Sequence, residues 1–355
     1  MGRLALPVNQ RFQRFPQFQG NIPYSSGAQS NPLPLVQTEY MAALDLISKQ
    51  QVASGSAAPT GLNGAGAYAA LGNIQLKANG GVAPYALPGW HANIFEQTWN
   101  HDYVDGLATA PLVTSATNNW KNHIHLPLTV DPVTQKGCFY TGDVTLNLSL
   151  QLSMDTAAQM FGTVNGATVQ GSWDVWADKF AGPAPDVPGG WLDEISYLQF
   201  TKMYQSGVQL SNGTTPINLE VDQDFVTILL IFYTGTRDAS SFAPANALYT
   251  SMNLTVNDRK IWDTVPEDWV RFTMLQTYDL VLPAGTAVID FNRLEPASRR
   301  DILPTDPQST KRLLLEITST STANFVDVVT QTTVDSEYAV KWIQSAKQRA
   351  GKRAA

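Results

Sequence analysis

Charged residues are scarce in this 355-residue chain: Asp, Glu, Lys and Arg together make up 15% of it. An average soluble protein contains about 25%. Hydrophobic residues make up an ordinary 43%, so neutral polar side chains take the place of the missing charge. A chain with this apolar content is not expected to be disordered. A helical bundle is excluded as well, because its solvent-facing helices would need more Glu, Lys and Leu.

The chain also has only one cysteine and no long apolar run. The single cysteine, Cys138, excludes a disulfide within the chain and fits folding in a reducing compartment. The longest apolar or hydroxyl run, Phe225–Tyr233, is far shorter than the ~20 residues of a membrane-spanning helix. No sustained apolar segment follows Arg3, so no secretory signal is expected. We therefore expect a soluble, β-rich protein that is made inside the cell.

The net charge of −7 is distributed unevenly. Residues 1–38 sum to +3 and residues 341–355 to +5, both without any acid, so the body between them carries −15. Basic ends on an acidic body favour arms that contact an anionic partner or an acidic neighbour, with solubilising tails as the alternative. The candidate contact residues are the basic residues of both ends and three phenylalanines: Arg3, Arg11, Phe12, Arg14, Phe15, Phe18, Lys341, Lys347, Arg349, Lys352 and Arg353.

The N-terminal part of the chain changes pattern twice. The first 35 residues are rich in Gln, Pro and Asn and predict an extended arm. Residues 36–51 place apolar side chains three and four residues apart, which predicts one amphipathic helix. Residues 53–90 are rich in Ala and Gly and predict a long loop region in which only 73–77 forms a strand. Such a loop is unusual in a compact domain and indicates external contacts.

Further along the chain the hydrophobic period becomes two. In Asp143–Met154 apolar residues alternate with Thr, Asn, Ser and Gln, which is typical of a half-buried antiparallel strand. Phe225–Tyr233 is apolar on both faces and is predicted to lie in the middle of a sandwich. One helix is predicted over 267–275, with Asp263 or Thr264 as its cap. The other predicted strands are 123–126, 194–203, 217–221, 248–256, 278–282, 286–291, 312–318 and 325–334.

Strands at this spacing, without the alternating helices of a parallel sheet, predict a sandwich or a jelly roll. The two strand-rich blocks, 91–205 and 209–335, each have the size of one eight-stranded roll. The predicted fold class is therefore all-β, with two consecutive eight-stranded jelly rolls (a double jelly roll) after an N-terminal arm and helix. The divisions that we expect are 1–52 for the arm and amphipathic helix, 53–208 for the first roll, 209–340 for the second roll and 341–355 for a basic C-terminal tail.

The pair His123 and His125 comes closest to a metal site. On a strand, residues two apart share a face, so both imidazoles could reach one ion, as in cupins. A cupin would need a glutamate shortly after the second histidine and a third histidine further on, and the sequence has neither after His125. Two ordinary strand histidines are therefore the default interpretation, and His123 and His125 stay as weak metal candidates only.

The remaining candidate catalytic or ligand-binding residues lack the neighbouring residues that such a site would need. Asp193 and Glu194 are adjacent and would face opposite sides of a strand, so they are a poor carboxylate pair for a glycosidase. Three tryptophans suit either a sugar-stacking platform or core and interface positions: Trp173, Trp176 and Trp191. Cys138 has no nearby base, so burial is the better interpretation than a role as nucleophile. We therefore expect no catalytic residue, no cofactor and no enzymatic activity.

The order of these features resembles the double jelly-roll major capsid proteins of tailless icosahedral viruses with an internal membrane, the tectivirus-like bacteriophages in particular. The resemblance is carried mainly by LDEISYLQFTKMYQS (residues 192–206) and TPINLEVDQDFVTILLIFYTG (residues 215–235). In that family a Tyr-rich strand similarly closes the first roll before the chain enters the second. The resemblance is one of pattern and order, and it is best over 190–335.

This resemblance implies a structural protein of the virion, present in the host cytoplasm during assembly. It implies a homotrimer of pseudo-hexameric outline that makes lateral capsomer contacts and builds an icosahedral shell over an internal membrane. The implied partners are other copies of the chain, penton and minor capsid proteins, and the viral membrane through the termini, without specific nucleic-acid binding. A carbohydrate-binding β-sandwich (a lectin or receptor-binding protein) is the main alternative, and a cupin-type metalloenzyme is the enzymatic alternative.

Overall fold

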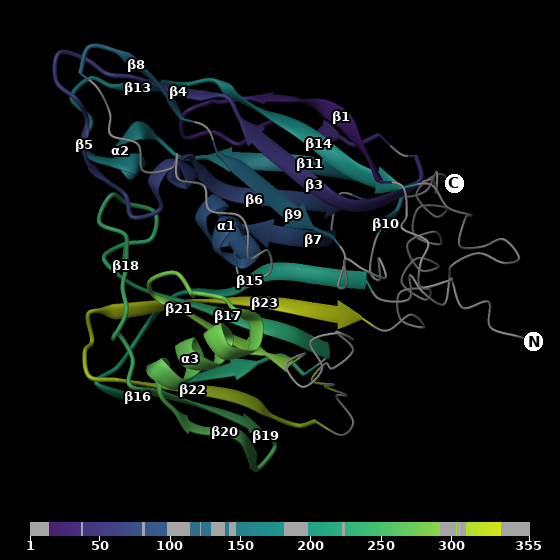
Figure 1. The fold of residues 1–355 in the computed structure, drawn as a ribbon, viewed down its shortest axis with the longest axis vertical. Coiled ribbons are helices and arrows are strands. Elements are labelled where there is room, and N and C mark those ends of the chain that lie inside the picture. The colour runs from purple at the N-terminus through teal and green to yellow at the C-terminus, as the bar shows by residue number, and fades with distance from the viewer. Residues whose placement is uncertain are drawn as a thin grey trace, which may run out of the picture.

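The fold is described by a computed structural model. The residues that it describes are 14–36, 38–79, 82–97, 114–120, 122–128, 139–141, 147–180, 198–221, 224–291, 303, 305 and 310–334. Figure 1 shows two β-sandwiches, one above the other, with the earlier part of the chain in the upper one and the later part in the lower one. One nine-stranded sheet, the shared sheet, runs through both. The all-β prediction is confirmed.

The outer sheet of the first roll has the order β1-β14-β3, with β9 and β10 along the other edge of β3. On β14 the side chains of Trp173, Val175 and Ala177 are buried, and those between them are half-buried. A period of two puts alternate side chains on opposite faces, so one apolar face of this sheet turns to the core. The strands are β1 (Arg14–Pro23), β3 (Tyr40–Ser48), β9 (His123–Pro127), β10 (Phe139–Tyr140) and β14 (Ser172–Phe180).

The shared sheet has the order β18-β17-β23-β15-β7-β6-β11-β2, with β21 paired to β17. The two rolls join where β15 and β7 run parallel, with Thr201 opposite Tyr85 and Lys202 opposite Ala86. The first roll contributes β2 (Leu33–Pro34), β6 (Leu71–Ala78), β7 (Val82–Leu87) and β11 (Leu148–Met154). The second contributes β15 (Leu198–Gln209), β17 (Asp224–Thr234), β18 (Ala243–Pro244), β21 (Thr286–Asp290) and β23 (Asn324–Val334).

A four-stranded sheet of order β16-β22-β19-β20 completes the second roll. Its strands are β16 (Gly213–Leu219), β19 (Ser251–Val256), β20 (Arg259–Val265) and β22 (Leu313–Ser319). Two small sheets extend the first roll, β12-β5 and β13-β4-β8. Their strands are β4 (Gln50–Ala53), β5 (Thr60–Leu62), β8 (Thr117–Trp120), β12 (Phe161–Thr163) and β13 (Thr168–Gln170). One cluster of buried apolar side chains runs through both rolls, so the two rolls are packed as one body.

Three α-helices lie among the described residues: α1 (Gly89–Gln97), α2 (Ala157–Met160) and α3 (Glu267–Tyr278). Helix α1 lies between the two rolls and α3 lies on the lower roll (Figure 1). The predicted helix over 267–275 is confirmed by α3. Its predicted cap at Asp263 or Thr264 is wrong, because both residues belong to β20, which extends to Val265. Pro266 occupies the N-cap position instead, without a side-chain hydrogen bond.

The amphipathic helix predicted over 36–51 is wrong, because this segment forms β3 and the start of β4. The first half of β3 is buried on both faces: Tyr40, Met41, Ala42, Ala43 and Leu44. Such a strand shows no two-residue alternation, and its apolar spacing then also fits a helix. Pairing with β14 on one side and β9 on the other decides the conformation. The predicted arm also contains a strand, β1, which pairs with β14 over its whole length.

The loop region predicted over 53–90 is more regular than expected. The predicted strand at 73–77 is confirmed by β6, and β5, β7 and a short 3-10 helix, Gly66–Ala70, lie in the same region. All five residues of that 3-10 helix are buried. The small side chains allow this close packing: a Cβ at Gly89 would lie only 2.8 Å from the carbonyl oxygen of Tyr68. An Ala- and Gly-rich composition therefore marks tight packing here.

Most other predicted strands are confirmed by β9, β15, β16, β17, β19, β21, β22 and β23. β11 confirms the later part of the strand predicted over 143–154, with Leu148, Leu150 and Leu152 buried. Residues 142–146 and 181–197 lie outside the described residues. The strand predicted at 278–282 is wrong: Asp279 ends α3 in the left-handed conformation, with φ 53°, and 280–282 form no strand.

Candidate functional site

The two weak metal candidates, His123 and His125, lie on the same face of β9, as their spacing predicts. Both rings contact one carboxylate of the neighbouring strand β3. Nε2 of His123 and Nδ1 of His125 each lie 2.8 Å from Oδ1 of Asp45. The backbone amide of His125 also donates a hydrogen bond to Glu96 of α1 at 3.0 Å. We name these four residues, Asp45, Glu96, His123 and His125, the outer histidine cluster.

In the outer histidine cluster, the two imidazoles stabilise the ionised carboxylate of Asp45. Burial alone would raise the pKa of Asp45, but the hydrogen bonds and charges of the two histidines outweigh it and hold the pKa of Asp45 well below its usual range. Burial lowers the pKa of His125, yet Asp45, Glu96 and Asp178 outweigh it, so the net shift raises the pKa of His125. In the part of the chain that the structure describes, no group of three His, Cys, Asp or Glu could hold a metal ion. His123 and His125 both contact the Asp45 carboxylate of the neighbouring strand.

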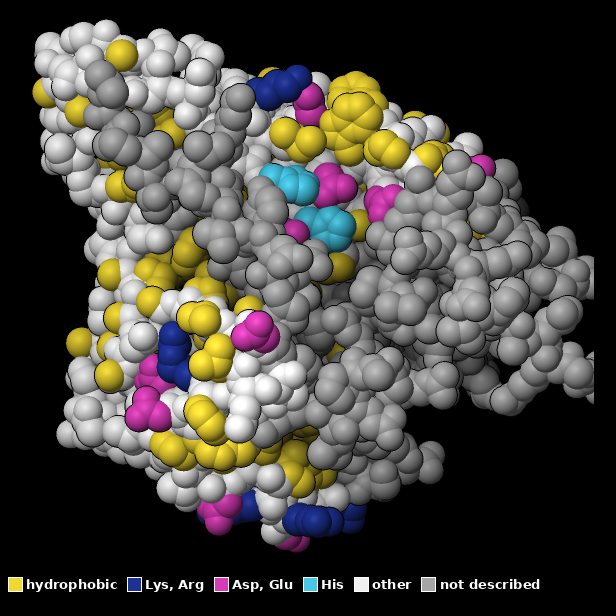
Figure 2. Space-filling view, in the orientation of Figure 1, with side chains coloured by type: hydrophobic (Ala, Val, Ile, Leu, Met, Phe, Trp, Pro, Cys, Tyr) yellow, Lys and Arg dark blue, Asp and Glu magenta, His cyan; other side chains and the backbone are white. Residues whose placement is uncertain are grey.

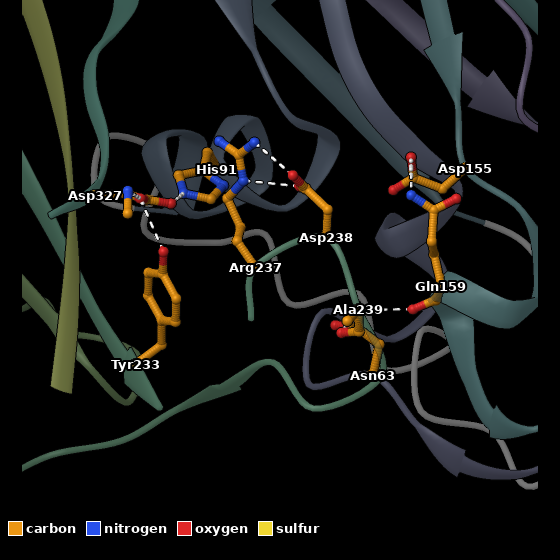
Figure 3. Close-up of polar contacts among 10 residues, drawn as sticks. Asn63, His91, Asp155, Gln159, Tyr233, Arg237, Asp238, Ala239 and Asp327 are labelled. Carbon is orange, nitrogen blue, oxygen red and sulfur yellow. Dashed lines mark hydrogen bonds and ion pairs between the residues drawn. The ribbon is translucent and has the colours of Figure 1, made fainter. Parts of the chain in front are cut away.

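A second histidine–carboxylate contact joins the two rolls (Figure 3). Nε2 of His91 on α1 lies 2.8 Å from Oδ2 of Asp327 on β23, and the two side chains are only 1% and 0% exposed. Oδ1 of Asp327 accepts hydrogen bonds from the hydroxyl of Tyr233 at 3.1 Å and from the amide of Gly207 at 2.5 Å. We name His91, Gly207, Tyr233 and Asp327 the inter-roll cluster. Its members come from α1 of the first roll and from β15, β17 and β23.

The inter-roll cluster stabilises an ionised carboxylate away from water. Burial alone would raise the pKa of Asp327, but the hydrogen bond and charge of His91, the Gly207 amide and the charge of Arg237 outweigh it and lower that pKa. Burial and the Asp327 charge both raise the pKa of Tyr233, so its hydroxyl stays a donor. A buried charge is tolerated only when it is paired and hydrogen-bonded. The cluster meets that condition only while α1 lies against β23.

A polar contact next to this cluster also spans the two rolls (Figure 3). The side-chain amide of Asn63 donates to the carbonyl of Ala239 at 2.8 Å and to the carbonyl of Gln159 at 3.3 Å. Arg237 forms two hydrogen bonds with Asp238, at 2.8 and 2.9 Å. Burial and the charge of Asp238 raise the pKa of Asp155 in the first roll to about 6, although Arg237 opposes the shift. The join between the rolls therefore holds a carboxyl group that titrates near neutral pH.

Hydrophobic side chains are visible at several places on the face that Figure 2 shows, and two groups of them lie over the outer sheet and over α3. One group, the first-roll patch, lies on the outer sheet. Phe18 of β1 is 48% exposed, and its ring centroid lies 5.2 Å from that of Trp176 on β14. Trp176 lies opposite Asp45 of β3, and the exposed Ile47 follows two residues later on β3. The other group, the α3 patch, consists of Trp269, Phe272 and Leu275 on α3 and Trp262 on β20. Contiguous exposed apolar side chains of this kind mark contact surfaces.

Most of the predicted terminal contact residues lie outside the described residues. They are Arg3, Arg11, Phe12, Lys341, Lys347, Arg349, Lys352 and Arg353. The structure describes Arg14, Phe15 and Phe18 in β1, and it brings Phe18 against Trp176. Trp173 is fully buried and belongs to the core. Cys138, Trp191, Asp193 and Glu194 also lie outside the described residues.

Sequence reasoning missed the residues with the strongest polar contacts. His91 and Asp327 are 236 positions apart, and no local pattern relates them. Lys179 was also missed, although it lies on β14 two residues after the buried Ala177. Its side chain is fully buried and its ammonium group donates to the carbonyls of Val36 and Thr38 at 2.6 and 3.1 Å. Burial, only partly opposed by Glu39, lowers the pKa of Lys179 to about 8. This lysine ties the segment before β3 onto β14.

No model of a known protein family matches the sequence, and no curated protein matches it either. Among described residues, no helix has the length and apolar content to span a bilayer. Solved structures do match. The major capsid protein of Sulfolobus Turreted Icosahedral Virus has a TM-score of 0.70 and 13% identity, with 90% of this chain and 96% of that chain covered.

Two further matches come from other viruses. The major capsid protein P2 of Bacteriophage PM2 has a TM-score of 0.57 and 17% identity, with 90% of this chain and 97% of that chain covered. A chain of the PBCV-1 virus capsid has a TM-score of 0.58 and 11% identity, with 91% and 94% covered. Each match covers nearly the whole of both chains, so the likeness includes both rolls and the join between them. The predicted resemblance in fold is thus confirmed, and the chain has the double jelly-roll fold of the viral major capsid proteins.

Proposed function

We propose that this protein is a major capsid protein that assembles as trimers of pseudo-hexameric outline into an icosahedral virus shell. The observation that carries the proposal is the whole-chain match to a capsid protein at a TM-score of 0.70. A fold alone does not determine a function, so the surface and the join between the rolls must fit as well. Within this proposal the chain is a structural component of the virion and catalyses no reaction.

The join between the rolls supports a role as a building block. A shell subunit has to keep its conformation while it contacts several neighbouring subunits. Here the shared sheet continues from one roll to the other through β15 and β7, and the buried inter-roll cluster fixes α1 against β23. A buried carboxylate that contacts His91 and accepts hydrogen bonds from Gly207 and Tyr233 favours one relative position of the two rolls. A rigid two-roll unit follows from these contacts.

The surface also suits repeated lateral contact. The chain has few charges, so neighbouring copies repel one another little at short distance. Among the described residues, exposed hydrophobic side chains lie in the first-roll patch and the α3 patch, as in proteins that bury part of their surface in an assembly. Edge strands such as β20 and β2 are further covered when copies assemble.

We further infer that the two basic ends reach the particle interior. Residues 1–13 and 341–355 hold seven basic residues and no acid, and Phe12 adds apolar anchoring. Each basic residue near an anionic bilayer contributes about 1 kcal/mol. Contact with the internal membrane is the role we propose for them, and contact with the acidic bodies of neighbouring copies is the alternative. Penton and minor capsid proteins and assembly in the host cytoplasm belong to the same proposal.

The assembly state of the purified full chain tests this proposal. Sedimentation velocity is expected to show a stable trimer at micromolar concentration, and electron microscopy is expected to show three-fold particles or shells. A strictly monomeric chain across ordinary salt concentrations would overturn the capsid role. Flotation with anionic and neutral vesicles then tests the ends. Because β1 begins at Arg14, the matched truncation removes only 1–13 and 341–355, and equal flotation of both forms would exclude a membrane role for the ends.

A further inference from the structure

A row of polar side chains crosses the shared sheet inside the second roll. Thr227 of β17 lies opposite Gln331 of β23. Asp290 of β21 lies on the other side of Thr227, and Thr201 of β15 lies on the other side of Gln331. The four strands are neighbours in the sheet (Figure 1). Directly opposite residues of antiparallel strands share a face, so these four side chains form one line, which we name the polar row.

The polar row is buried, and two neighbouring atoms in it are unpartnered. Thr227 and Gln331 are 0% and 3% exposed. In the part of the chain that the structure describes, the hydroxyl oxygen of Thr227 and the side-chain carbonyl oxygen of Gln331 have no hydrogen-bond partner. Most buried polar atoms of native proteins have such a partner, because burial without one costs stability. A hydroxyl and an amide that lie opposite each other in this state are the two reactants of an ester bond.

The strand register brings the two groups within reach of each other. Directly opposite residues of antiparallel strands have Cβ atoms about 4.5–5.5 Å apart. The amide carbon Cδ of Gln331 is two bonds from its Cβ, and the hydroxyl of Thr227 is one bond from its own. The register of β17 also shifts between Phe225 and Thr227, and a bulge of this kind turns the side chains beside it. Rotation of the two side chains is therefore enough to bring the hydroxyl against the amide carbon.

We propose that Thr227 and Gln331 form an ester bond that links β17 covalently to β23. Oγ1 of Thr227 attacks Cδ of Gln331, and the bond between Oγ1 and Cδ forms while the bond between Cδ and Nε2 breaks. The Asp290 carboxylate takes the hydroxyl proton, and the nitrogen leaves with that proton as ammonia. The reaction needs no oxidant, metal or cofactor. The chain reacts once with itself, without turnover, and this inference does not rest on the capsid role.

The neighbours of Gln331 decide which threonine reacts. Two threonines flank it, but only Thr227 has a carboxylate, that of Asp290, opposite it in the polar row. Thr201 lies opposite Tyr85 instead and already has an interaction of its own. A carboxylate beside a hydroxyl is the arrangement that general-base activation requires. The product ester has neither an N–H nor an O–H group, so the reaction removes the unpartnered hydroxyl and ties together two strands that are far apart in the sequence.

Intact-mass spectrometry of the denatured full chain tests the bond. Loss of ammonia should place the wild type about 17 Da below the mass of its sequence. Thr227→Val should have its full sequence mass, and Thr227→Ser, which restores a hydroxyl, should lose ammonia again. The matched control is Thr330→Val, because the hydroxyl of Thr330 is buried and equally unpartnered but lies opposite Ile228. The control should keep the loss of about 17 Da, and a wild type of full sequence mass would overturn the proposal.

Peptide mapping tests which residues are joined. Trypsin releases Thr227 in peptide 203–237 and Gln331 in peptide 313–341, where it is the only glutamine. The two peptides should be found as one joined species that mild alkali separates, since alkali hydrolyses an ester. Ammonia loss without this species, as from an imide at an Asn-Gly step, would overturn the proposal. A peptide joined through Thr201 would overturn the assignment to Thr227.

The time course of the mass change tests the role of Asp290. Full chains are sampled at intervals after synthesis, and circular dichroism checks that each variant is folded. Asp290→Asn removes the proton acceptor and should slow the loss of ammonia by about 100-fold or more. A merely structural role of Asp290 would leave the rate of the folded variant unchanged, and that result would overturn the assignment of the proton acceptor.

Discussion

Two histidine–carboxylate clusters among the described residues have the same chemistry and the same contact length but different surroundings. In the outer histidine cluster, Asp45 lies 2.8 Å from two imidazoles on a sheet surface where all three side chains are half-buried. In the inter-roll cluster, Asp327 lies 2.8 Å from His91 and no water reaches either group. Water can replace a lost partner only in the outer cluster. The difference shows that burial, and not the hydrogen-bond length, decides how much a contact matters to the fold.

The largest expected effect comes from breaking the inner contact. His91→Leu leaves the Asp327 carboxylate buried without the imidazole that contacts it, which should lower the free energy of unfolding by about 3–5 kcal/mol. Urea denaturation of the full chain measures this loss. The double variant His91→Leu/Asp327→Leu also removes the buried carboxylate and should recover part of the lost stability. If the single variant loses under about 1 kcal/mol, the pair contributes no more than a surface contact.

The next effect concerns the pH dependence of the join between the rolls. The pKa of Asp155 is raised to about 6, above the about 3.9 of an unfolded chain. Its protonated form is therefore favoured in the fold, and this contribution to stability is lost as pH rises through about 6. Asp155→Asn should make the protein more stable at pH 7.5 by about 1–2 kcal/mol, a value reduced for solvent screening of a half-buried group. Thermal unfolding of both proteins from pH 4 to pH 8 should show their stabilities diverging as pH rises, and parallel profiles would contradict the assignment.

A smaller effect is expected at the outer histidine cluster. Asp45→Asn removes the carboxylate that both imidazoles contact and should cost about 1 kcal/mol. The lowered pKa of Asp45 stabilises the fold above about pH 3.9 and the benefit is lost as pH falls through the folded value. The raised pKa of His125 stabilises the fold below about pH 6.5 and that benefit is lost as pH rises through its folded value. The wild type should therefore exceed the variant most between about pH 4 and pH 6.5, and a difference that does not change with pH would refute this account.

The smallest effect is expected at the exposed pair of Lys49 and Asp174 on the same outer sheet. Both groups remain in contact with solvent, so Lys49→Met should change the free energy of unfolding by under about 0.5 kcal/mol. High salt should remove even that difference, whereas it should leave the His91→Leu loss intact. Chemical denaturation at low and high salt makes the comparison. A salt-sensitive loss at His91 would mean that water reaches the inner cluster.

Segments with a clear local signal were predicted correctly. β17 is buried from Phe225 to Tyr233 and lies inside the second roll, and α3 has both helical spacing and an acidic first turn. β11 alternates strictly, and its leucines are buried. β3 was predicted as a helix because a strand buried on both faces loses its period of two. The resemblance to double jelly-roll capsid proteins was visible from the number and spacing of strands, before any pairing was known.

The sequence by itself determined the all-β class and the strand face that His123 and His125 share, because these follow from periodicity within a few residues, and the size of the two strand-rich blocks indicated two rolls. Only the tertiary structure decided that β15 joins β7, that Asp45 lies between two histidines, and that His91 of one roll meets Asp327 of the other. It also decided that α1 is covered and the outer face of α3 is not. Contacts between distant segments leave no periodic signal in a single sequence, since each depends on how whole sheets stack and not on the spacing of neighbouring side chains.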